Sequence, residues 1–198
     1  AVEVAGVKFD DKIHVGTGDL VVNGAGLRKK AVFKVYAIAL YLPEKRGDAE
    51  AVLAAKGSKR IAISLLRDLS AQQFVEALQE GVANNHSEAE MVGLKDRLKQ
   101  FSDTMLAAGE PKTGTSVVID WLPESGTRLT INGQVKGKDI AGEDFYRALL
   151  KIWLGNKPVQ DDLKQALLGK PSCGLLPAVM RPLAEPAATG YQAVIPAA

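Results

Sequence analysis

The most constraining segment of this sequence covers residues 30–42 and reads Lys-Ala-Val-Phe-Lys-Val-Tyr-Ala-Ile-Ala-Leu-Tyr-Leu. It is dense in β-branched and aromatic residues, its interior carries a single charge at Lys34, and it stops at Pro43. Apolar residues on both faces are typical of a strand that is covered on both sides for most of its length. We therefore predict a central β-strand here, for which the rest of the chain must supply neighbours and covers.

Further β-like stretches precede and follow this strand. Residues 1–27 are rich in glycine and short apolar runs, which favours hairpins, and they lead into Gly24-Ala25-Gly26. We interpret that step as a turn, because a phosphate-binding loop needs a third glycine and a helix where a strand follows here. Residues 60–66, 116–122 and 127–132 predict three more strands. The last two form an antiparallel meander, with a second tight turn at Asn132-Gly133.

Two helices have clear start signals. Ser70 with Gln73 and Ser87 with Glu90 each form a capping box, and apolar residues at helical spacing follow both. We also expect a helix over residues 48–56, one lined by Phe145, Leu149, Ile152 and Trp153, and a short one over 161–168. Strands and helices in this order predict an α+β fold.

The chain of 198 residues is expected to hold one domain. After Gly169 the composition shifts to proline and alanine without periodicity, so we assign residues 1–169 to the domain and 170–198 to a tail that the fold does not need. The first residues, Ala-Val-Glu-Val-Ala, resemble an end left by a signal peptidase. We therefore expect a periplasmic or otherwise exported protein.

Composition narrows the range of partners. A formal net charge of +2 gives no electrostatic reason to expect nucleic acid or an anionic membrane, and Arg28-Lys29-Lys30 is too short for a nucleic-acid patch. No run approaches the roughly 18 apolar residues of a membrane-spanning helix. The sequence predicts neither nucleic-acid binding nor a transmembrane segment, and it leaves the oligomeric state open.

Several kinds of catalytic and metal chemistry lack their residues. His14 and His86 are the only histidines and have no partner at metal-ligand spacing, and no Gly-x-Ser-x-Gly motif supplies a nucleophile. The lone Cys173 has no motif around it. We expect neither a metal nor a cofactor.

Arg28 is the most informative polar residue. Tyr36 follows it by eight residues, which places both on one face if the segment is a single strand. An arginine and a tyrosine hydroxyl that open onto an apolar cleft suit an anionic head group, because a guanidinium can grip a carboxylate with two charge-assisted hydrogen bonds. A surface ion pair of Arg28 is the alternative interpretation.

Four features of the sequence, taken together, resemble the chalcone isomerase-like family, in its bacterial branch. They are Asn23-Gly24-Ala25-Gly26-Leu27-Arg28, the strand over 32–42, the pair Arg67-Asp68, and the segment from Ala148 to Lys164. The resemblance covers roughly residues 3–168. It implies one large antiparallel sheet with a layer of helices packed on one face, an open-faced sandwich, and a ligand cleft between the two layers.

The family contains enzymes that cyclise chalcones and noncatalytic members similar to fatty-acid-binding proteins. The enzyme's arginine is matched by Arg28, but Phe74, Ala77, Gly81 and Ile152 stand where the enzyme has polar groups. Losing one donor that supports a developing oxyanion can cost roughly 100-fold to 1000-fold in rate. The resemblance therefore favours the noncatalytic branch, in which an arginine and a tyrosine hold a carboxylate.

The leading hypothesis is a noncatalytic binder of a small apolar carboxylate such as a fatty acid. Its head group would lie at Arg28 and Tyr36, and the candidate wall residues are Phe74, Leu78, Val82 and Ile152. Two alternatives stay open: an isomerase or lyase of the chalcone isomerase type with Tyr36 as proton donor, and a structural or partner-binding protein without a ligand. An enclosed apolar cavity with Arg28 at one end would favour binder or enzyme, and a filled core would favour the structural role.

Overall fold

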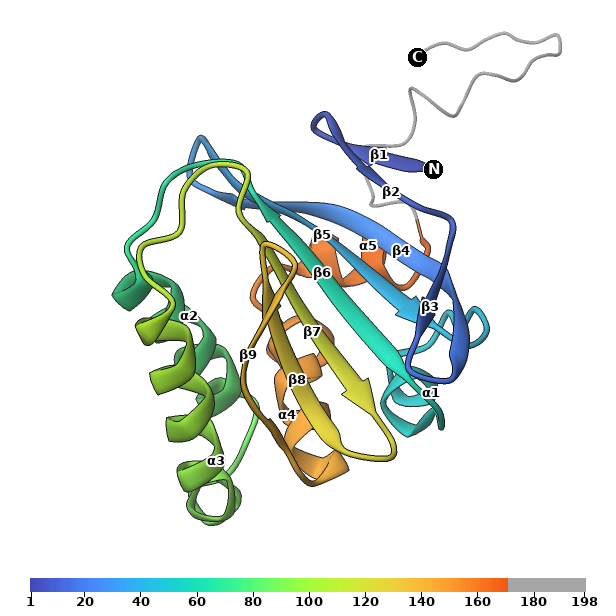
Figure 1. Ribbon diagram of the computed structural model, residues 1–198. Helices are drawn as coiled ribbons and strands as arrows, with labels where there is room; N and C mark the ends of the chain where they lie inside the picture. Colours follow the sequence, from blue (N-terminus) through green and yellow to red (C-terminus); the bar gives the residue numbers. More distant parts are fainter. Residues whose placement is uncertain (171–198) are drawn as a thin grey trace, which may run out of the picture.

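The computed structural model describes residues 1–170, so the predicted tail, beyond its first residue, lies outside the described residues. One antiparallel sheet with the strand order β3-β4-β5-β6-β7-β8-β9 dominates it (Figure 1). The spatial order of the strands is their order in the sequence, because each strand pairs with the strand that follows it in the chain. The strands are β3 Lys12–Val15, β4 Gly18–Lys30, β5 Phe33–Leu42, β6 Lys59–Leu65, β7 Ser116–Leu122, β8 Gly126–Ile131 and β9 Gln134–Ile140.

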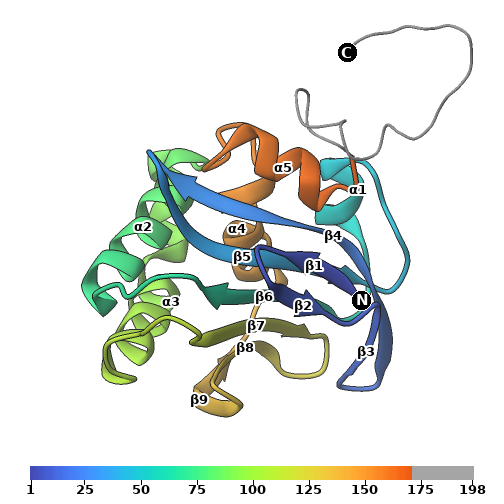
Figure 2. The same ribbon diagram turned by 90° about the horizontal axis from the view of Figure 1, so that it is seen from above.

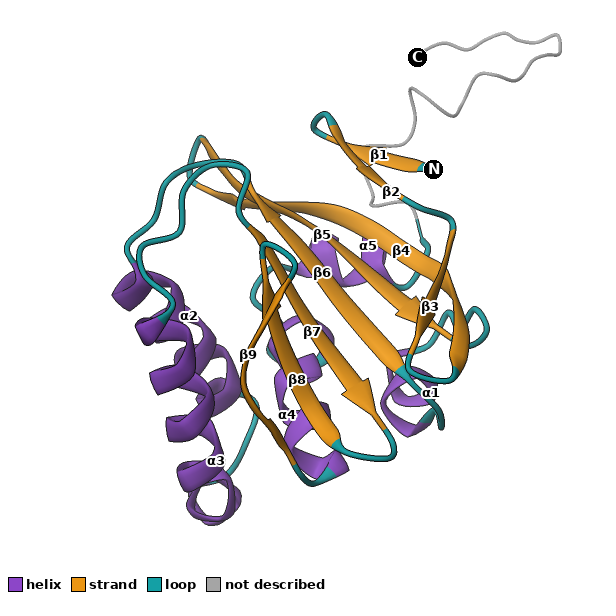
Figure 3. Ribbon diagram, in the orientation of Figure 1, coloured by secondary structure: helices purple, strands orange, loops and turns teal. Residues whose placement is uncertain are grey.

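The helices lie on one face of this sheet (Figure 3), which confirms the predicted α+β class. Both predicted capping boxes are present: Ser70 accepts from the backbone N–H of Gln73 at 3.0 Å, and Ser87 accepts from that of Glu90 at 3.1 Å. The helices are α1 Ala49–Ala54, α2 Ala71–Asn84, α3 Glu88–Ala107, α4 Glu143–Leu154 and α5 Asp161–Leu167.

The main core lies between the sheet and the helices. Strand β6 shows how the sequence builds it, since Ile61, Ile63 and Leu65 are buried while the residues between them are half-buried on the other face. Helix α4 contributes Tyr146 and Trp153, two of the largest fully buried side chains. An amphipathic helix of this kind needs the apolar sheet face as its partner.

A small hairpin covers part of the opposite face. It consists of β1 Val2–Val4 and β2 Val7–Phe9, and it lies across the sheet from α4 and α5 (Figure 2). Ala37, Ala39 and Tyr41 of β5 form a second buried cluster with Phe9 there. The predicted strand is therefore covered on both faces, although β6 and not β5 occupies the middle of the sheet.

The prediction of a turn at Gly24-Ala25-Gly26 is wrong, because these residues lie inside β4. Their glycines serve a different purpose: a Cβ atom at Gly24 would collide with the backbone of Ala166, and one at Gly26 would lie 2.6 Å from Leu163 Cδ1. Helix α5 thus packs directly on the backbone of β4. Glycine is the residue that permits so close an approach.

Strand β9 is an element that the sequence did not predict. Its seven residues, Gln-Val-Lys-Gly-Lys-Asp-Ile, are mostly exposed and lack an apolar alternation, because β9 is the edge strand of the sheet. Gly137 in its middle adopts a left-handed φ of 67°. An edge strand that is charged and irregular avoids pairing with other chains.

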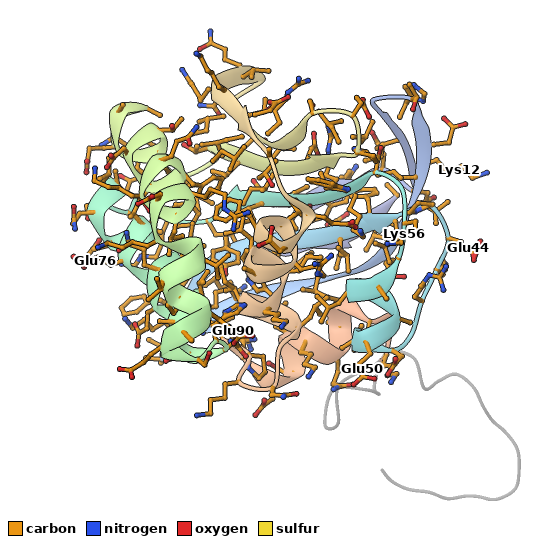
Figure 4. The ribbon with its side chains drawn as sticks, turned by 90° about the horizontal axis from the view of Figure 1, so that it is seen from below. Lys12, Glu44, Glu50, Lys56, Glu76 and Glu90 are labelled. Atoms are coloured by element: carbon orange, nitrogen blue, oxygen red, sulfur yellow. The ribbon has the colours of Figure 1, made fainter. Side chains whose placement is uncertain are left out.

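Most charged side chains lie at the periphery of the molecule, and Lys59 and Asp120 are the buried exceptions among residues 1–170. Glu44, Glu50 and Glu76 point outward from the loop after β5, from α1 and from α2, respectively (Figure 4). Among the helices of residues 1–170, none is both long and apolar enough to cross a membrane.

Candidate functional site

Arg28 and Tyr36 meet at one end of the sheet, where they are paired across β4 and β5. The expectation that they share one strand at period two is wrong, because the chain reverses at Ala31 and Val32 between them. They still share a face, since directly opposed residues of antiparallel strands point to the same side. Gly24, Gly26 and Arg28 alternate along β4, so Arg28 is the first side chain on the helix-facing side beyond the segment that α5 covers.

The guanidinium of Arg28 has only neutral partners. Its Nη1 donates to the carbonyl oxygen of Lys29 at 3.0 Å, and to the carbonyl of Val159 and the side-chain oxygen of Gln160, both at 3.4 Å. Within residues 1–170 no carboxylate lies within 4.0 Å of it. The alternative interpretation of Arg28 as one half of an ion pair therefore finds no partner in the described chain.

Gln160 holds this arrangement in place. Its side-chain amide donates to the carbonyl of Leu27 at 2.9 Å, and its side-chain oxygen accepts from the backbone N–H of Lys29 at 2.9 Å. Gln160 thus fastens the segment before α5 to the end of β4 on both sides of Arg28. No pattern in the sequence indicates this role of Gln160, because the role depends on where α5 begins in space.

Tyr36 is buried, and a tryptophan fixes its hydroxyl. The indole N–H of Trp153, on α4, donates to the Tyr36 oxygen at 2.9 Å. Across the described residues no acceptor takes the hydrogen of that hydroxyl. Trp153 was expected only as a helix-lining residue, although a buried indole N–H generally requires an acceptor.

Burial keeps the Tyr36 hydroxyl neutral. Desolvation raises the pKa of Tyr36 to about 12, against the smaller opposing effects of the Trp153 hydrogen bond and the positive charge of Arg28. A neutral phenol is a hydrogen-bond donor. Near neutral pH the pair therefore presents a cation and a free O–H donor at the same end of the sheet.

The expected wall residues all lie in the main core, which also contains Tyr36. Phe74, Leu78 and Val82 of α2 and Ile152 of α4 are all buried. The ring of Phe74 meets that of Tyr36 edge-on, with 6.5 Å between centroids and 84° between planes. Of the predicted wall residues, Phe74 contacts Tyr36 directly, and all four belong to the packed main core.

Two of the replaced enzyme positions are coupled. A Cβ atom at Gly81 would lie 2.8 Å from Cγ2 of Ile152, so the space that Gly81 leaves is filled by Ile152. Ala77, the third position, is exposed on α2 and takes no part in the cluster. Together with Phe74, these residues place apolar packing where the enzyme's polar groups are expected.

A small cavity of about 60 Å³ is lined in part by Phe74, whose ring also contacts that of Tyr36. Its apolar lining includes Met105, Val117 and Ile131, and Glu110 and Asn132 contribute polar atoms. Ligand pockets usually measure roughly 300 to 1,000 Å³. Arg28 does not line this cavity, and the core at this end of the sheet is filled in the conformation described here. Within residues 1–170 the expected ligand cleft with Arg28 at one end is therefore not open, and the filled core is what the structural alternative predicts.

Neither histidine hydrogen-bonds to Arg28 or Tyr36. His14 contacts Asp19 at 2.8 Å on the β3–β4 hairpin, and His86 contacts the carbonyl of Val82 at 2.6 Å. No group of three or more histidine, cysteine or acidic residues in the described part of the chain is arranged to hold a metal ion.

The fold and this site place the chain among known proteins. A family model described as chalcone isomerase-like matches residues 1–169, and the chain belongs to that family. No curated protein sequence matches it.

A solved structure shows the same fold. It is the crystal structure of a fatty-acid binding protein of Arabidopsis thaliana, which is 17% identical to this chain and superimposes with a TM-score of 0.67. The alignment covers 82% of this chain and 92% of that one. At this identity the likeness establishes the architecture, a curled antiparallel sheet with helices on one side.

Proposed function

We propose that this protein binds an apolar molecule with a carboxylate head group, such as a fatty acid, and does not transform it. The observation that carries the proposal is that two groups at the end of the sheet lack a partner that a carboxylate could supply. Arg28 has no carboxylate within 4.0 Å among residues 1–170, and the Tyr36 hydroxyl hydrogen has no acceptor there. One carboxylate would satisfy both.

The head group would exchange weak contacts for strong ones. Two of the three acceptors of Arg28 lie at 3.4 Å, which is long for a hydrogen bond to a guanidinium. Charge-assisted bonds to a carboxylate are shorter and roughly twice as strong as neutral ones. Trp153 donates to the Tyr36 oxygen and leaves the phenolic hydrogen for an acceptor, which the ligand carboxylate would supply.

The apolar tail would occupy the space that Phe74 now fills. Phe74 contacts Tyr36 and also lines the 60 Å³ cavity, so a different rotamer of its ring would be the first change needed to admit a tail. Further room requires α2 and α3 to move away from the sheet. The printed description of the Arabidopsis relative as a fatty-acid binding protein agrees with this assignment.

The replaced positions support binding without turnover. The side chain of Ile152 fills the space beside Gly81, and Phe74 contributes only an apolar ring. These positions therefore offer no polar group to stabilise an oxyanion.

The first test is mass spectrometry of organic extracts of the purified full-length protein, in which we expect a copurifying acid. The second is calorimetric titration of delipidated protein with dodecanoic acid and with dodecanol. The acid should bind at least about tenfold more tightly, because the alcohol cannot form the two-point contact with Arg28. Equal affinities, or no binding of any chain length of acid, would refute the carboxylate site.

A further inference from the structure

The turn between β4 and β5 carries the most exposed large apolar side chain of the described residues, Val32, with the exposed Phe33 next to it. Val32 is 88% exposed and Phe33 is 52% exposed. Five large hydrophobic residues are exposed in residues 1–170, and these two are the pair adjacent in sequence. Ala31 before them adopts a left-handed φ of 56°, which sharpens the turn and projects both side chains at its end.

Positive charge surrounds these two side chains. Residues 28–34 contain Arg28, Lys29, Lys30 and Lys34 and no acidic residue. A fifth cation comes from the loop after β6, since the guanidinium carbon of Arg67 lies 4.1 Å from the centroid of the Phe33 ring. We call residues 28–34 together with Arg67 the basic tip.

The fold assembles the basic tip from distant parts of the chain. The backbone N–H of Leu66 donates to the carbonyl of Val35 at 2.9 Å, which places the start of the β6–α2 loop beside β5. Figure 1 shows this loop and the β4–β5 turn at the same end of the sheet. The nearest acid in the loop, Asp68, already accepts two hydrogen bonds from Thr113 and does not pair with Arg67.

This combination has a specific physical match. Basic residues near an anionic membrane surface each contribute about 1 kcal/mol, and apolar side chains at the same place gain by entering the boundary of the hydrocarbon. An aromatic ring with a cation against it suits that interface, because the ring can sit at headgroup depth while the guanidinium meets phosphate. A nucleic acid would use the cations but would leave Val32 in water.

We propose that the basic tip docks on an anionic phospholipid bilayer. Val32 and Phe33 enter the interface, and Lys29, Lys30, Lys34 and Arg67 contact lipid phosphates. The small net charge of the whole chain does not reveal this site, because acidic residues elsewhere in the chain offset the cations of the basic tip. The inference goes beyond the carboxylate site, although Arg28 belongs to both and a docked tip would hold that site next to the membrane.

The test is flotation of the full-length protein with vesicles free of fatty acid. Vesicles of phosphatidylglycerol and phosphatidylcholine in a ratio of about 1:3 should bind it, and binding should fall with added salt. Pure phosphatidylcholine should bind it at least about tenfold more weakly.

Matched variants separate insertion from simple charge attraction. The double variant Val32→Glu/Phe33→Glu should reduce binding at least about tenfold. Val135→Glu is the control, because Val135 is also exposed, at 56%, but lies on β9 away from the basic tip. It should bind as the parent does, and thermal melting should show that all variants are folded.

A fluorescence readout provides independent evidence. In the variant Phe33→Trp, emission should shift to the blue when anionic vesicles are added, since the native Trp121 and Trp153 are already buried. Tyr36→Phe should weaken acid binding and leave vesicle binding unchanged, which distinguishes failure of one site from failure of the other.

Three results would overturn the proposal. One is the absence of binding to anionic vesicles by the parent. Another is undiminished binding by the Val32→Glu/Phe33→Glu variant. The third is binding to heparin that equals vesicle binding and ignores both substitutions, which would assign the basic tip to polyanions in general.

Discussion

Two cations lie on the helix side of the same sheet, near opposite ends, and the chain treats them differently. Lys59, at the start of β6, is completely buried, and its Nζ lies 3.5 Å from the carboxylate of Glu143 on α4. Arg28 is half-buried and has only neutral acceptors among residues 1–170. Burial lowers the pKa of Lys59, and the negative charge of Glu143 opposes that shift. The fold therefore supplies its own counter-ion at one end and leaves a charge unpaired at the other.

We interpret this difference as a structural role for Lys59 and a ligand-binding role for Arg28. The charge of Lys59 is balanced by Glu143 within the fold, although its Nζ makes no hydrogen bond among residues 1–170, so we interpret the Lys59 end as a structural ion pair. Under the proposed function, Arg28 without a paired acid and the Tyr36 hydroxyl without an acceptor are the contacts for the carboxylate of a ligand.

Removing the unpaired cation should have the largest effect, and it should appear in binding. Arg28→Ala should weaken binding of a long-chain acid by about 2 to 5 kcal/mol, because it deletes the charged half of the contact. Arg28→Lys should restore part of the loss, since an ammonium lacks the planar two-point grip. Calorimetric titration measures both.

The control for Arg28→Ala is Arg46→Ala, because Arg46 lies near Glu44 on the surface and has no place in the site. It should bind acid as the parent does. If Arg28→Ala does so too, the contrast between the two ends has no functional meaning.

Removing the internal acid should affect stability instead. Glu143→Gln leaves the Lys59 amine buried without a countercharge, which should cost about 2 to 4 kcal/mol in the free energy of unfolding. Lys59→Met should cost less, because Glu143 is partly exposed and keeps Arg147 within 3.8 Å. Urea denaturation of the two variants and of Arg28→Ala tests the order, and Arg28→Ala should change stability by less than about 1 kcal/mol. An equal loss from Arg28→Ala would mean that both ends are structural.

High pH should reveal the buried phenol. The pKa of Tyr36 is about 12 in the folded protein and about 10 in the unfolded chain, so the unfolded chain releases its proton first as pH rises. Stability should therefore fall between about pH 10 and about pH 12, by roughly 1 kcal/mol per pH unit from this group. Tyr41, whose pKa burial also raises to about 12, adds a similar contribution. In urea unfolding, the free energy of unfolding of Tyr36→Phe should decline less steeply with rising pH than that of the parent. Identical slopes would show that the decline comes from groups other than Tyr36.

The smallest expected effect is on chalcone turnover, where we expect none above background. Phe74, Gly81 and Ile152 form apolar packing at the positions where that reaction needs polar groups. An absorbance assay at high protein concentration measures it. Flavanone formation that depends on the protein and disappears in Arg28→Ala would show that the site is catalytic.

Local signals in the sequence predicted local structure well. The capping boxes at Ser70 and Ser87 located two helix starts, because a cap depends only on residues three positions apart. The alternation in residues 116–132 predicted the meander for the same reason. Strand β9 escaped prediction, since an exposed edge needs no apolar pattern.

Contacts between distant segments were the harder part. The family resemblance identified Arg28 and Tyr36, but the geometric reason given for their proximity was wrong, because the turn at Ala31 makes them cross-strand neighbours. Trp153 and Gln160 complete the site through the placement of α4 and α5, over separations of more than a hundred residues. A single sequence does not encode such placement in any local pattern.

The glycines of β4 have a mechanical consequence for the two walls of the site. Helix α5 meets β4 by its backbone at Gly24 and through the side chains of Leu163 and Ala166 at Gly26, so β4 contributes no side chain there that could change rotamer and let the layers slide. Helix α2 meets the core through Phe74 and Leu78, whose side chains can repack. One wall is therefore stiff and the other compliant. A guest molecule would be held against the stiff wall and admitted through the compliant one, and amide exchange should be slower in α5 than in the first turns of α2.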